Sequence, residues 1–167
     1  MTERSRLARG TTVEACQALL EIEPLVVTED ADVVHVMRLA AAQPQTRLVG
    51  VVDAAGRIVG VIPILRLAES VIARVAPEAL LADLSDIASA ARFTHSIEDR
   101  TAAEIMIEPA TISPAGLVAE AFRRMHERHL SGLYVVDDAG RPVGYLDLLE
   151  LAILAADELD AHPTNPG

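Results

Sequence analysis

The clearest regularity in the sequence is a pattern of apolar and polar positions that occurs twice. The segment EPLVVTEDADVVHVMRLA at 23–40 lines up with EPATISPAGLVAEAFRRM at 108–125, and VVDAAGRIVG at 51–60 matches VVDDAGRPVG at 135–144 at eight of ten positions. In each copy a short extended run precedes a stretch of helical spacing, and two β-branched runs then flank a turn. The pattern predicts a βαββα unit written twice.

The first helix of each copy is predicted by apolar residues that recur at helical spacing. These residues are Val33, Val36, Met37 and Ala40 in the first copy, and Val118, Ala121, Phe122 and Met125 in the second. Thr28 and Ser113 are the predicted N-caps, because a hydroxyl can accept a hydrogen bond from an orphan backbone N–H. Pro114 then stands where a first helical residue tolerates proline.

A hairpin and a closing helix complete each copy. The strands LVGVV and IVGVI, and in the second copy LYVVD and PVGYL, flank the turns DAAGR and DDAGR. Gly56 and Gly140 are the positions in these turns where a positive φ is expected. The returning strands lead into predicted helices at 64–75 and 148–159.

The duplication predicts the architecture, because one such unit leaves an apolar sheet face that it cannot cover alone. We expect an α/β (α+β) fold of two repeats packed sheet to sheet with pseudo-two-fold symmetry, plus connecting helices. The expected divisions are 12–75 for the first repeat with its N-terminal helix, 76–100 for a connecting helical segment, 101–160 for the second repeat and 161–167 for a disordered tail. Helix packing between two copies would give a homodimer.

The amino-acid composition argues against some classes of binding partner. Among 167 residues 51% are hydrophobic but 2% are aromatic, and the net charge is −11. A strongly acidic chain with few aromatic residues argues against nucleic acid and against an anionic membrane surface. The charged start and the lack of an 18-residue apolar run predict a soluble cytoplasmic protein. The lone Cys16 lies in VEACQALL, a predicted helix, and is expected to be a small buried apolar residue.

The two copies resemble a tandem pair of cystathionine-β-synthase (CBS) domains, a Bateman module. The resemblance rests on TAAEIMIEPATISP, which opens the second copy, on HLSGLYVVDDAGRPVGYLDLLE, which closes it, and on the weaker first copy. It implies a regulatory protein without catalysis that binds AMP, ADP, ATP or S-adenosylmethionine, and that acts on a separate enzyme or transporter. Some members of the family instead bind Mg²⁺.

The resemblance also assigns roles to residues. In the family motif a Thr or Ser meets phosphate, and an Asp three residues later accepts from both ribose hydroxyls. The second copy has Asp147 and Glu150 at these positions, and the first has Pro63 and Arg66. Glu150 can hold a diol, whereas Asp147 would repel phosphate and Arg66 cannot accept a hydrogen bond. Arg66 either grips a phosphate or is a solvated helix residue.

The candidate ligand residues follow from this assignment together with the strand starts. They are Pro109, Ala110, Thr111, Ser131, Gly132, Asp147, Glu150 and Arg66. Gly132 beside Ser131 is expected to let a ligand approach the backbone closely.

Other readings of the sequence stay open at this point. Asp137 and Asp138, with Asp147 and Glu150, could hold Mg²⁺ through oxygen ligands, although aspartates in a turn also serve the backbone. His126 and His129 share a helix face that suits a transition metal or a pH-responsive helix end. The mismatches at Pro63, Arg66 and Asp147 also allow a ligand-free dimerisation module. No catalytic motif occurs, so enzymatic activity is not expected.

Overall fold

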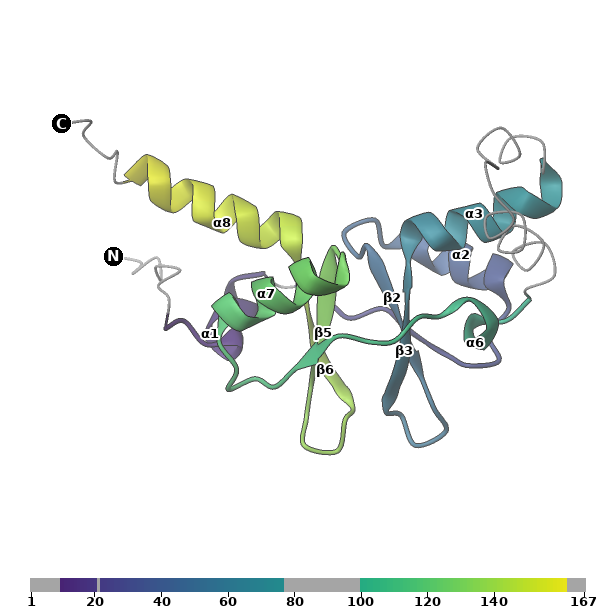
Figure 1. Cartoon of the computed structure of the whole chain (residues 1–167), viewed down its shortest axis with the longest axis horizontal. Helices are drawn as coiled ribbons and strands as arrows, with labels where there is room; N and C mark the ends of the chain where they lie inside the picture. The colour runs from purple at the N-terminus through teal and green to yellow at the C-terminus, as the bar shows by residue number, and fades with distance from the viewer. Residues whose placement is uncertain (1–9, 21, 77–99, 162–167) are drawn as a thin grey trace. The chain divides into compact units, whose positions relative to one another are not determined.

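The computed structural model describes residues 10–20, 22–76 and 100–161. Most of the predicted connecting segment and the predicted tail lie outside these residues. The chain divides into two compact units, drawn together in Figure 1: a C-terminal unit of residues 1–24 and 110–167, and an N-terminal unit of residues 25–109. Each unit holds one copy of the repeat and one mixed three-stranded sheet, so the α/β fold class is confirmed.

The N-terminal unit contains a sheet of order β1-β2-β3. Its elements are β1 (Val26–Thr28), α2 (Val33–Ala42), β2 (Leu48–Val52), β3 (Ile58–Pro63), α3 (Ile64–Val75) and α6 (Ala102–Ile105). β1 pairs with β2 in parallel, and β2 pairs with β3 as an antiparallel hairpin. α2 and α3 pack against each other on this sheet (Figure 1).

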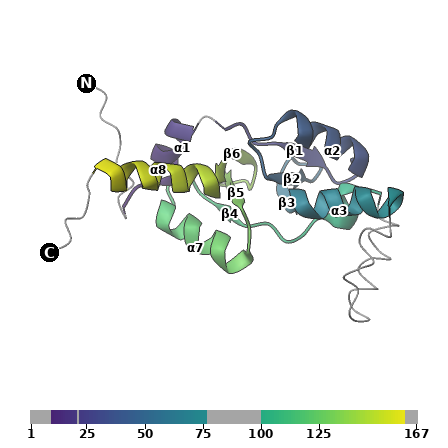
Figure 2. The ribbon, with the colours of Figure 1, turned by 90° about the horizontal axis from the view of Figure 1, so that it is seen from above.

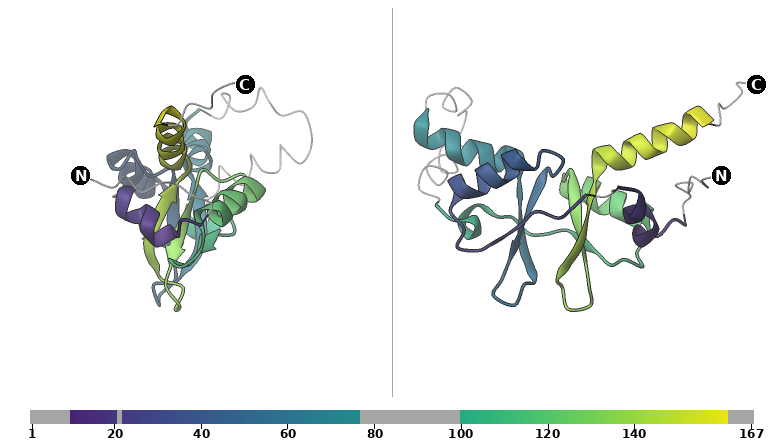
Figure 3. Two further views of the ribbon diagram at one scale, coloured as in Figure 1. Left: turned by 90° about the vertical axis from the view of Figure 1, so that its left-hand side faces the viewer. Right: turned by 180° about the vertical axis from the view of Figure 1, so that it is seen from behind.

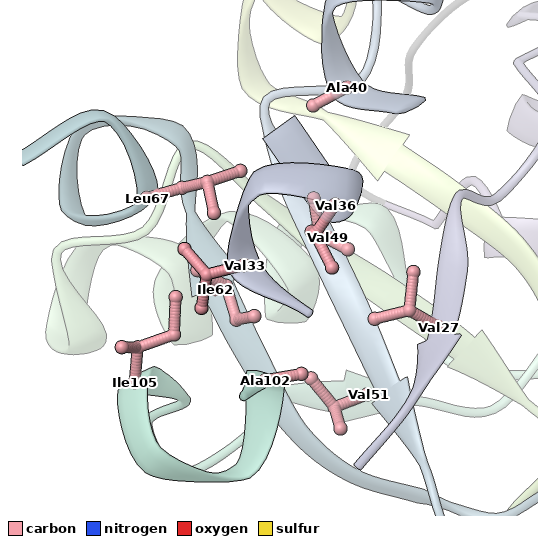
Figure 4. Packing of buried hydrophobic residues seen from close by; sticks show 10 residues of the cluster. All are labelled: Val27, Val33, Val36, Ala40, Val49, Val51, Ile62, Leu67, Ala102 and Ile105. Carbon is pink, nitrogen blue, oxygen red and sulfur yellow. The ribbon is translucent and has the colours of Figure 1, made fainter. Parts of the chain in front are cut away.

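Aliphatic side chains form the core of this unit (Figure 4). Val33 and Val36 of α2 face Val49 and Ile62 of the sheet, and Leu67 of α3 closes one side. Each side chain of this kind contributes about 1.5–3 kcal/mol when it is fully buried. The helical spacing that the sequence showed therefore marks the buried face of α2.

The C-terminal unit repeats the topology with a sheet of order β4-β5-β6. Its elements are α1 (Val13–Leu20), β4 (Thr111–Ile112), α7 (Val118–Arg128), β5 (Gly132–Val136), β6 (Pro142–Asp147) and α8 (Leu148–Ala161). α8 runs on directly from β6, and seen from above it projects between α1 and α7 (Figure 2). Cys16 of α1 is buried, as predicted.

Each unit takes one helix from the part of the sequence that precedes the other repeat. α1 docks in the C-terminal unit, where Val13 donates to the carbonyl of Gly116 at 2.8 Å and Val118 donates to that of Thr11 at 3.0 Å (Figure 3). α6 docks in the N-terminal unit, where Ala102 donates to the carbonyl of Ala31 at 2.9 Å. The C-terminal unit is therefore not contiguous in the sequence, which the repeat alone did not indicate.

The hairpin predictions are confirmed and the cap predictions are wrong. Gly56 and Gly140 have φ of 76° and 78°. The cap of α2 is Asp32, not Thr28: its carboxylate accepts from the backbone N–H of Val34 and His35. A turn after β1 places Thr28 four residues before that cap.

The start of α7 differs from the prediction for the same reason. A turn closed by the Gly116 N–H on the Ser113 carbonyl, at 3.0 Å, follows β4. Pro114 lies in this turn, and the helix begins at Val118 after the N-cap residue Leu117. None of the helices within residues 10–20, 22–76 and 100–161 is long and apolar enough to cross a membrane.

Candidate functional site

The end of β6 and the start of β5 bring four of the candidate residues together in the C-terminal unit. Gly132 stands opposite Asp147 in the strand register, and the Leu148 N–H donates to the Ser131 carbonyl at 2.8 Å. Glu150 follows in the first turn of α8. The structure thus places Ser131 and Gly132 beside the segment that carries Asp147 and Glu150.

Asp147 points into the protein at this junction. Its carboxylate accepts a hydrogen bond from the Leu149 N–H at 2.9 Å and another from the Tyr145 hydroxyl at 3.3 Å, and the residue is 1% exposed. A carboxylate at the start of a helix is favourable because it meets the positive end of the helix dipole. Asp147 therefore stabilises the start of α8.

The space beside Gly132 is filled by the protein itself. A Cβ built on Gly132 would lie 2.2 Å from the Tyr145 hydroxyl oxygen and 2.8 Å from the Leu146 carbonyl oxygen. The glycine thus accommodates Tyr145, whereas the sequence had suggested that it admits a ligand. Tyr145 is a residue of the junction that sequence reasoning missed.

Glu150 is the second carboxylate of the junction. The residue is half-buried, and no hydrogen bond or ion pair of its side chain occurs within the described parts of the chain. A carboxylate in this state can accept two hydrogen bonds from neighbouring hydroxyls of a ligand.

The strand start at 109–111 contributes mainly backbone structure. Pro109 is the last residue of the N-terminal unit, and Ala110 is the first residue of the C-terminal part that follows it. The carbonyl of Ala110 accepts from the Tyr134 N–H at 3.4 Å, and that of Thr111 accepts from the Arg124 guanidinium. These carbonyls already have donors from the protein.

The N-terminal unit has an equivalent junction between a strand and a helix, and the charged residues at this junction are arginines. Pro63 ends β3 opposite Leu48, and the Ile64 N–H donates to the Arg47 carbonyl at 3.2 Å. Arg66 lies in the first turn of α3 and donates through Nε to the carbonyl of Ile105 in α6. Arg47 stands 84 residues before Ser131, so the sequence offset could have identified it as part of this junction.

The carboxylates suggested for Mg²⁺ are not brought together. Asp137 lies at the hairpin turn, and the six residues of β6 end at Asp147. A strand of this length spans about 17–20 Å. Within the described ranges no group of three or more His, Cys, Asp or Glu residues is placed to hold a metal ion.

Asp137 instead organises its own turn, in the same way as Asp53 in the other copy. Each aspartate accepts from the backbone N–H groups two and four residues later, and each forms an ion pair with an arginine, Arg57 at 2.7 Å or Arg141 at 2.9 Å. The pKa of both carboxyls is lowered, and the main cause is the hydrogen bond from the backbone N–H of the arginine. The turn interpretation of Asp137 is confirmed.

A groove of about 650 Å³ lies along the C-terminal end of α7. Its lining residues are Phe122, Arg123, Met125, His126, His129, Leu130, Ser131 and Leu148. His129 adopts a left-handed conformation with φ of 52° and ends the helix. Both histidines are exposed and line this groove together with Ser131, and among the described residues no third metal ligand joins them.

Known protein families and solved structures share the repeat and the fold described above. The model of the CBS domain family matches residues 18–73 and 102–156. No curated protein sequence matches the chain.

Solved structures with the same fold include a CBS domain-containing protein from Thermotoga maritima, with a TM-score of 0.70 and 23% identity over 90% of this chain and 97% of that one. The CBS domain pair of protein MJ0100, in complex with 5′-methylthioadenosine and S-adenosyl-L-methionine, has a TM-score of 0.65 and 20% identity over 89% and 98%. CBSX2 in complex with AMP has a TM-score of 0.60 and 21% identity over 89% and 98%.

Proposed function

Because the chain belongs to the CBS domain family and carries two such domains, we propose that it is a regulatory sensor of an adenosine-type nucleotide. Two proteins with the same fold bind adenosine compounds: protein MJ0100 binds 5′-methylthioadenosine and S-adenosyl-L-methionine, and CBSX2 binds AMP. A regulatory role without catalysis agrees with a sequence that has no nucleophile motif. The sensor acts on a separate enzyme or transporter.

The observation that carries this proposal is the state of Glu150. The residue is half-buried in the first turn of α8, and its carboxylate meets no donor within the described residues. The 2′ and 3′ hydroxyls of a ribose are two neighbouring donors that one carboxylate can accept together. The Ser131 hydroxyl can add a donor or an acceptor at the same junction.

The ligand binds more weakly at the N-terminal junction. Arg66 stands where Glu150 stands in the other copy, and a guanidinium cannot accept from a ribose hydroxyl. Its Nε already donates to Ile105. One nucleoside per chain, held at the Glu150 junction, is therefore the expected stoichiometry.

We also propose that two chains associate through the exposed apolar faces of α3 and α8. Leu65 and Val75 of α3 are 71% and 81% exposed, and Leu149 and Ile153 of α8 are 45% and 47% exposed. Leu65 and Leu149 occupy equivalent positions, 84 residues apart. A second copy presents the same apolar surface and covers it symmetrically.

Isothermal titration calorimetry with AMP, ADP, ATP and S-adenosylmethionine tests the ligand proposal. The wild type is expected to bind at least one of them, and Glu150→Ala is expected to weaken that binding at least tenfold. Arg66→Ala is the matched control at the equivalent position, and it is expected to retain the affinity. Absence of binding by all four ligands at millimolar concentration contradicts the proposal.

The second candidate function is a dimerisation module without a ligand. It is favoured by the internal contacts of Arg66 and Asp147, which commit both side chains to the protein. In that case Glu150→Ala leaves every ligand response unchanged, while Leu65→Glu with Leu149→Glu shifts the mass measured by analytical ultracentrifugation from dimer to monomer.

A further inference from the structure

α3 carries three buried polar atoms for which the described parts of the chain offer no hydrogen-bond partner. They are the hydroxyl oxygen of Ser70 and the Nε and Nη2 atoms of Arg74. Ser70 is 2% exposed, and Arg74 is half-buried in the last turn of the helix. A buried charged donor without an acceptor is strongly unfavourable, so an acceptor is needed here.

The geometry of these atoms defines the acceptor. The N–H bonds of Nε and Nη2 run side by side along one edge of the guanidinium group, and this edge matches the two oxygens of a carboxylate or phosphate. Ser70 precedes Arg74 by four residues, so both side chains lie on the same face of α3. A hydroxyl in a helix often bonds to the carbonyl four residues earlier, but Ser70 makes no such bond.

The charge of Glu104 in α6 interacts with that of Arg74, and one of its two carboxylate oxygens already accepts hydrogen bonds from the protein. Its Oε2 atom accepts from the backbone N–H groups of Arg100 and Thr101, each at 2.7 Å, and from the Thr101 hydroxyl at 3.0 Å. Those two backbone bonds are the main causes that lower the pKa of Glu104, and the charge of Arg74 lowers it further. Glu104 caps α6, and no hydrogen bond or ion pair joins it to Arg74 within the described residues, so the Nε and Nη2 atoms of Arg74 still lack an acceptor.

The second copy shows that the fold itself does not require these polar groups. The residue of α8 equivalent to Ser70, 84 positions later, is Leu154, and Glu158 stands at the position of Arg74. An apolar residue thus fills the place of the hydroxyl in a helix of the same origin. The Ser70 and Arg74 pair is therefore particular to α3.

We propose that Ser70 and Arg74 form a binding site for a small oxyanion, with two oxygens on Nε and Nη2 of Arg74 and one contact from the Ser70 hydroxyl. The site is separate from the Glu150 junction, which lies in the other compact unit. A phosphate or a carboxylate supplies the required pair of oxygens.

Thermal unfolding of the full chain in phosphate, in acetate and in chloride at matched ionic strength tests this site. Phosphate or acetate at ten times its Kd is expected to raise Tm by about 3–5 °C relative to chloride. Arg74→Gln and Ser70→Ala are expected to lose or reduce this rise. Arg38→Gln changes an exposed arginine of α2 in the same unit and is expected to keep it. Equal rises in Arg74→Gln and in the wild type overturn the proposal.

A second measurement on the wild type covers the case in which Arg74→Gln does not fold. The Nε–H resonance of Arg74 in a nitrogen-15 NMR spectrum, assigned by its loss in Arg74→Lys, is expected to shift on titration with phosphate or with acetate. An unchanged resonance up to tens of millimolar of both anions overturns the proposal. Glu150→Ala is expected to retain the anion response, and Ser70→Ala to retain nucleotide binding, so the two sites fail or succeed separately.

Discussion

The Tyr145 hydroxyl donates a hydrogen bond to the buried carboxylate of Asp147 at 3.3 Å. The equivalent residues of the first copy, 84 positions earlier, are Val61 and Pro63, and neither has a side chain that can form this bond. The same carboxylate accepts from the Leu149 N–H and fixes the first turn of α8. The polar pair therefore links the strand and the helix that position Glu150.

Replacing Tyr145 by Phe is expected to destabilise the protein by about 1–3 kcal/mol, because it removes one donor from a buried carboxylate. Urea unfolding followed by circular dichroism measures the loss. The same substitution made in an Asp147→Asn background is expected to cost less, since the charged acceptor is then absent. Equal costs in both backgrounds would show that the hydroxyl and the carboxylate are not coupled.

Replacing Asp147 by Ser is expected to strengthen the binding of phosphate-bearing nucleotides, if the ligand lies at the Glu150 junction as proposed. Two like charges at roughly 8 Å repel by about 2 kcal/mol at an effective dielectric of about 20. Removing that repulsion raises the affinity for AMP about thirty-fold, and the serine hydroxyl retains a cap for α8. Adenosine is the control because it carries no phosphate. An equal gain for adenosine and AMP would exclude the charge as the cause.

The hairpins were the part of the fold that the sequence predicted best. Positive φ at Gly56 and Gly140 is a local requirement of the turn, so the residue type alone reveals it. The helix caps were mistaken because the pattern gives the start of each helix only to within a few residues. Asp32, which lies between Thr28 and the first helical residue, is as good a cap by type, and the turn after β1 selects it.

The hairpin that carries the candidate residues was predictable from the sequence, but the directions of their side chains were not. The sequence predicted the hairpin, and the register that follows from its turn sets Gly132 opposite Asp147. The inward direction of Asp147 depends on Tyr145, and the small size of Gly132 depends on the same ring. The first copy has Leu48 in place of Gly132 and Val61 in place of Tyr145, so there the larger side chain lies on the first strand of the hairpin. This exchange is visible only when both strands are compared in register.

The turn aspartates predict a specific dependence of stability on pH. Hydrogen bonds from the arginine backbone N–H, followed by the side-chain and further backbone contacts, lower the pKa of Asp53 and Asp137 in the folded state. An unfolded aspartate has a pKa of about 3.9. The stabilising contribution is therefore complete above about pH 4 to 5, and it is lost as the pH falls through the lowered folded value.

Thermal unfolding between about pH 5 and about pH 2 measures this effect. The double variant Asp53→Asn with Asp137→Asn is expected to lose less Tm on acidification than the wild type does, since its two turns no longer titrate. Asp138→Asn removes an exposed carboxylate from the same turn and serves as the control. If the Tm of the double variant fell with pH as steeply as the Tm of the wild type, other carboxylates would determine acid unfolding.

The end of α7 offers a substitution that is expected to stabilise the protein. His129 has φ of 52°, and its N–H donates to the carbonyls of Met125 and His126. A side chain in this conformation costs about 1 kcal/mol or more, whereas glycine adopts it without strain and is the usual residue at this position. His129→Gly is therefore expected to raise the free energy of unfolding by about 0.5–1 kcal/mol. Glu127→Gly, within the same helix, is expected to lower it by about 1 kcal/mol. Chemical denaturation of both variants gives the comparison, and a loss of stability in His129→Gly would show that the imidazole makes a contact in the groove that outweighs the backbone strain.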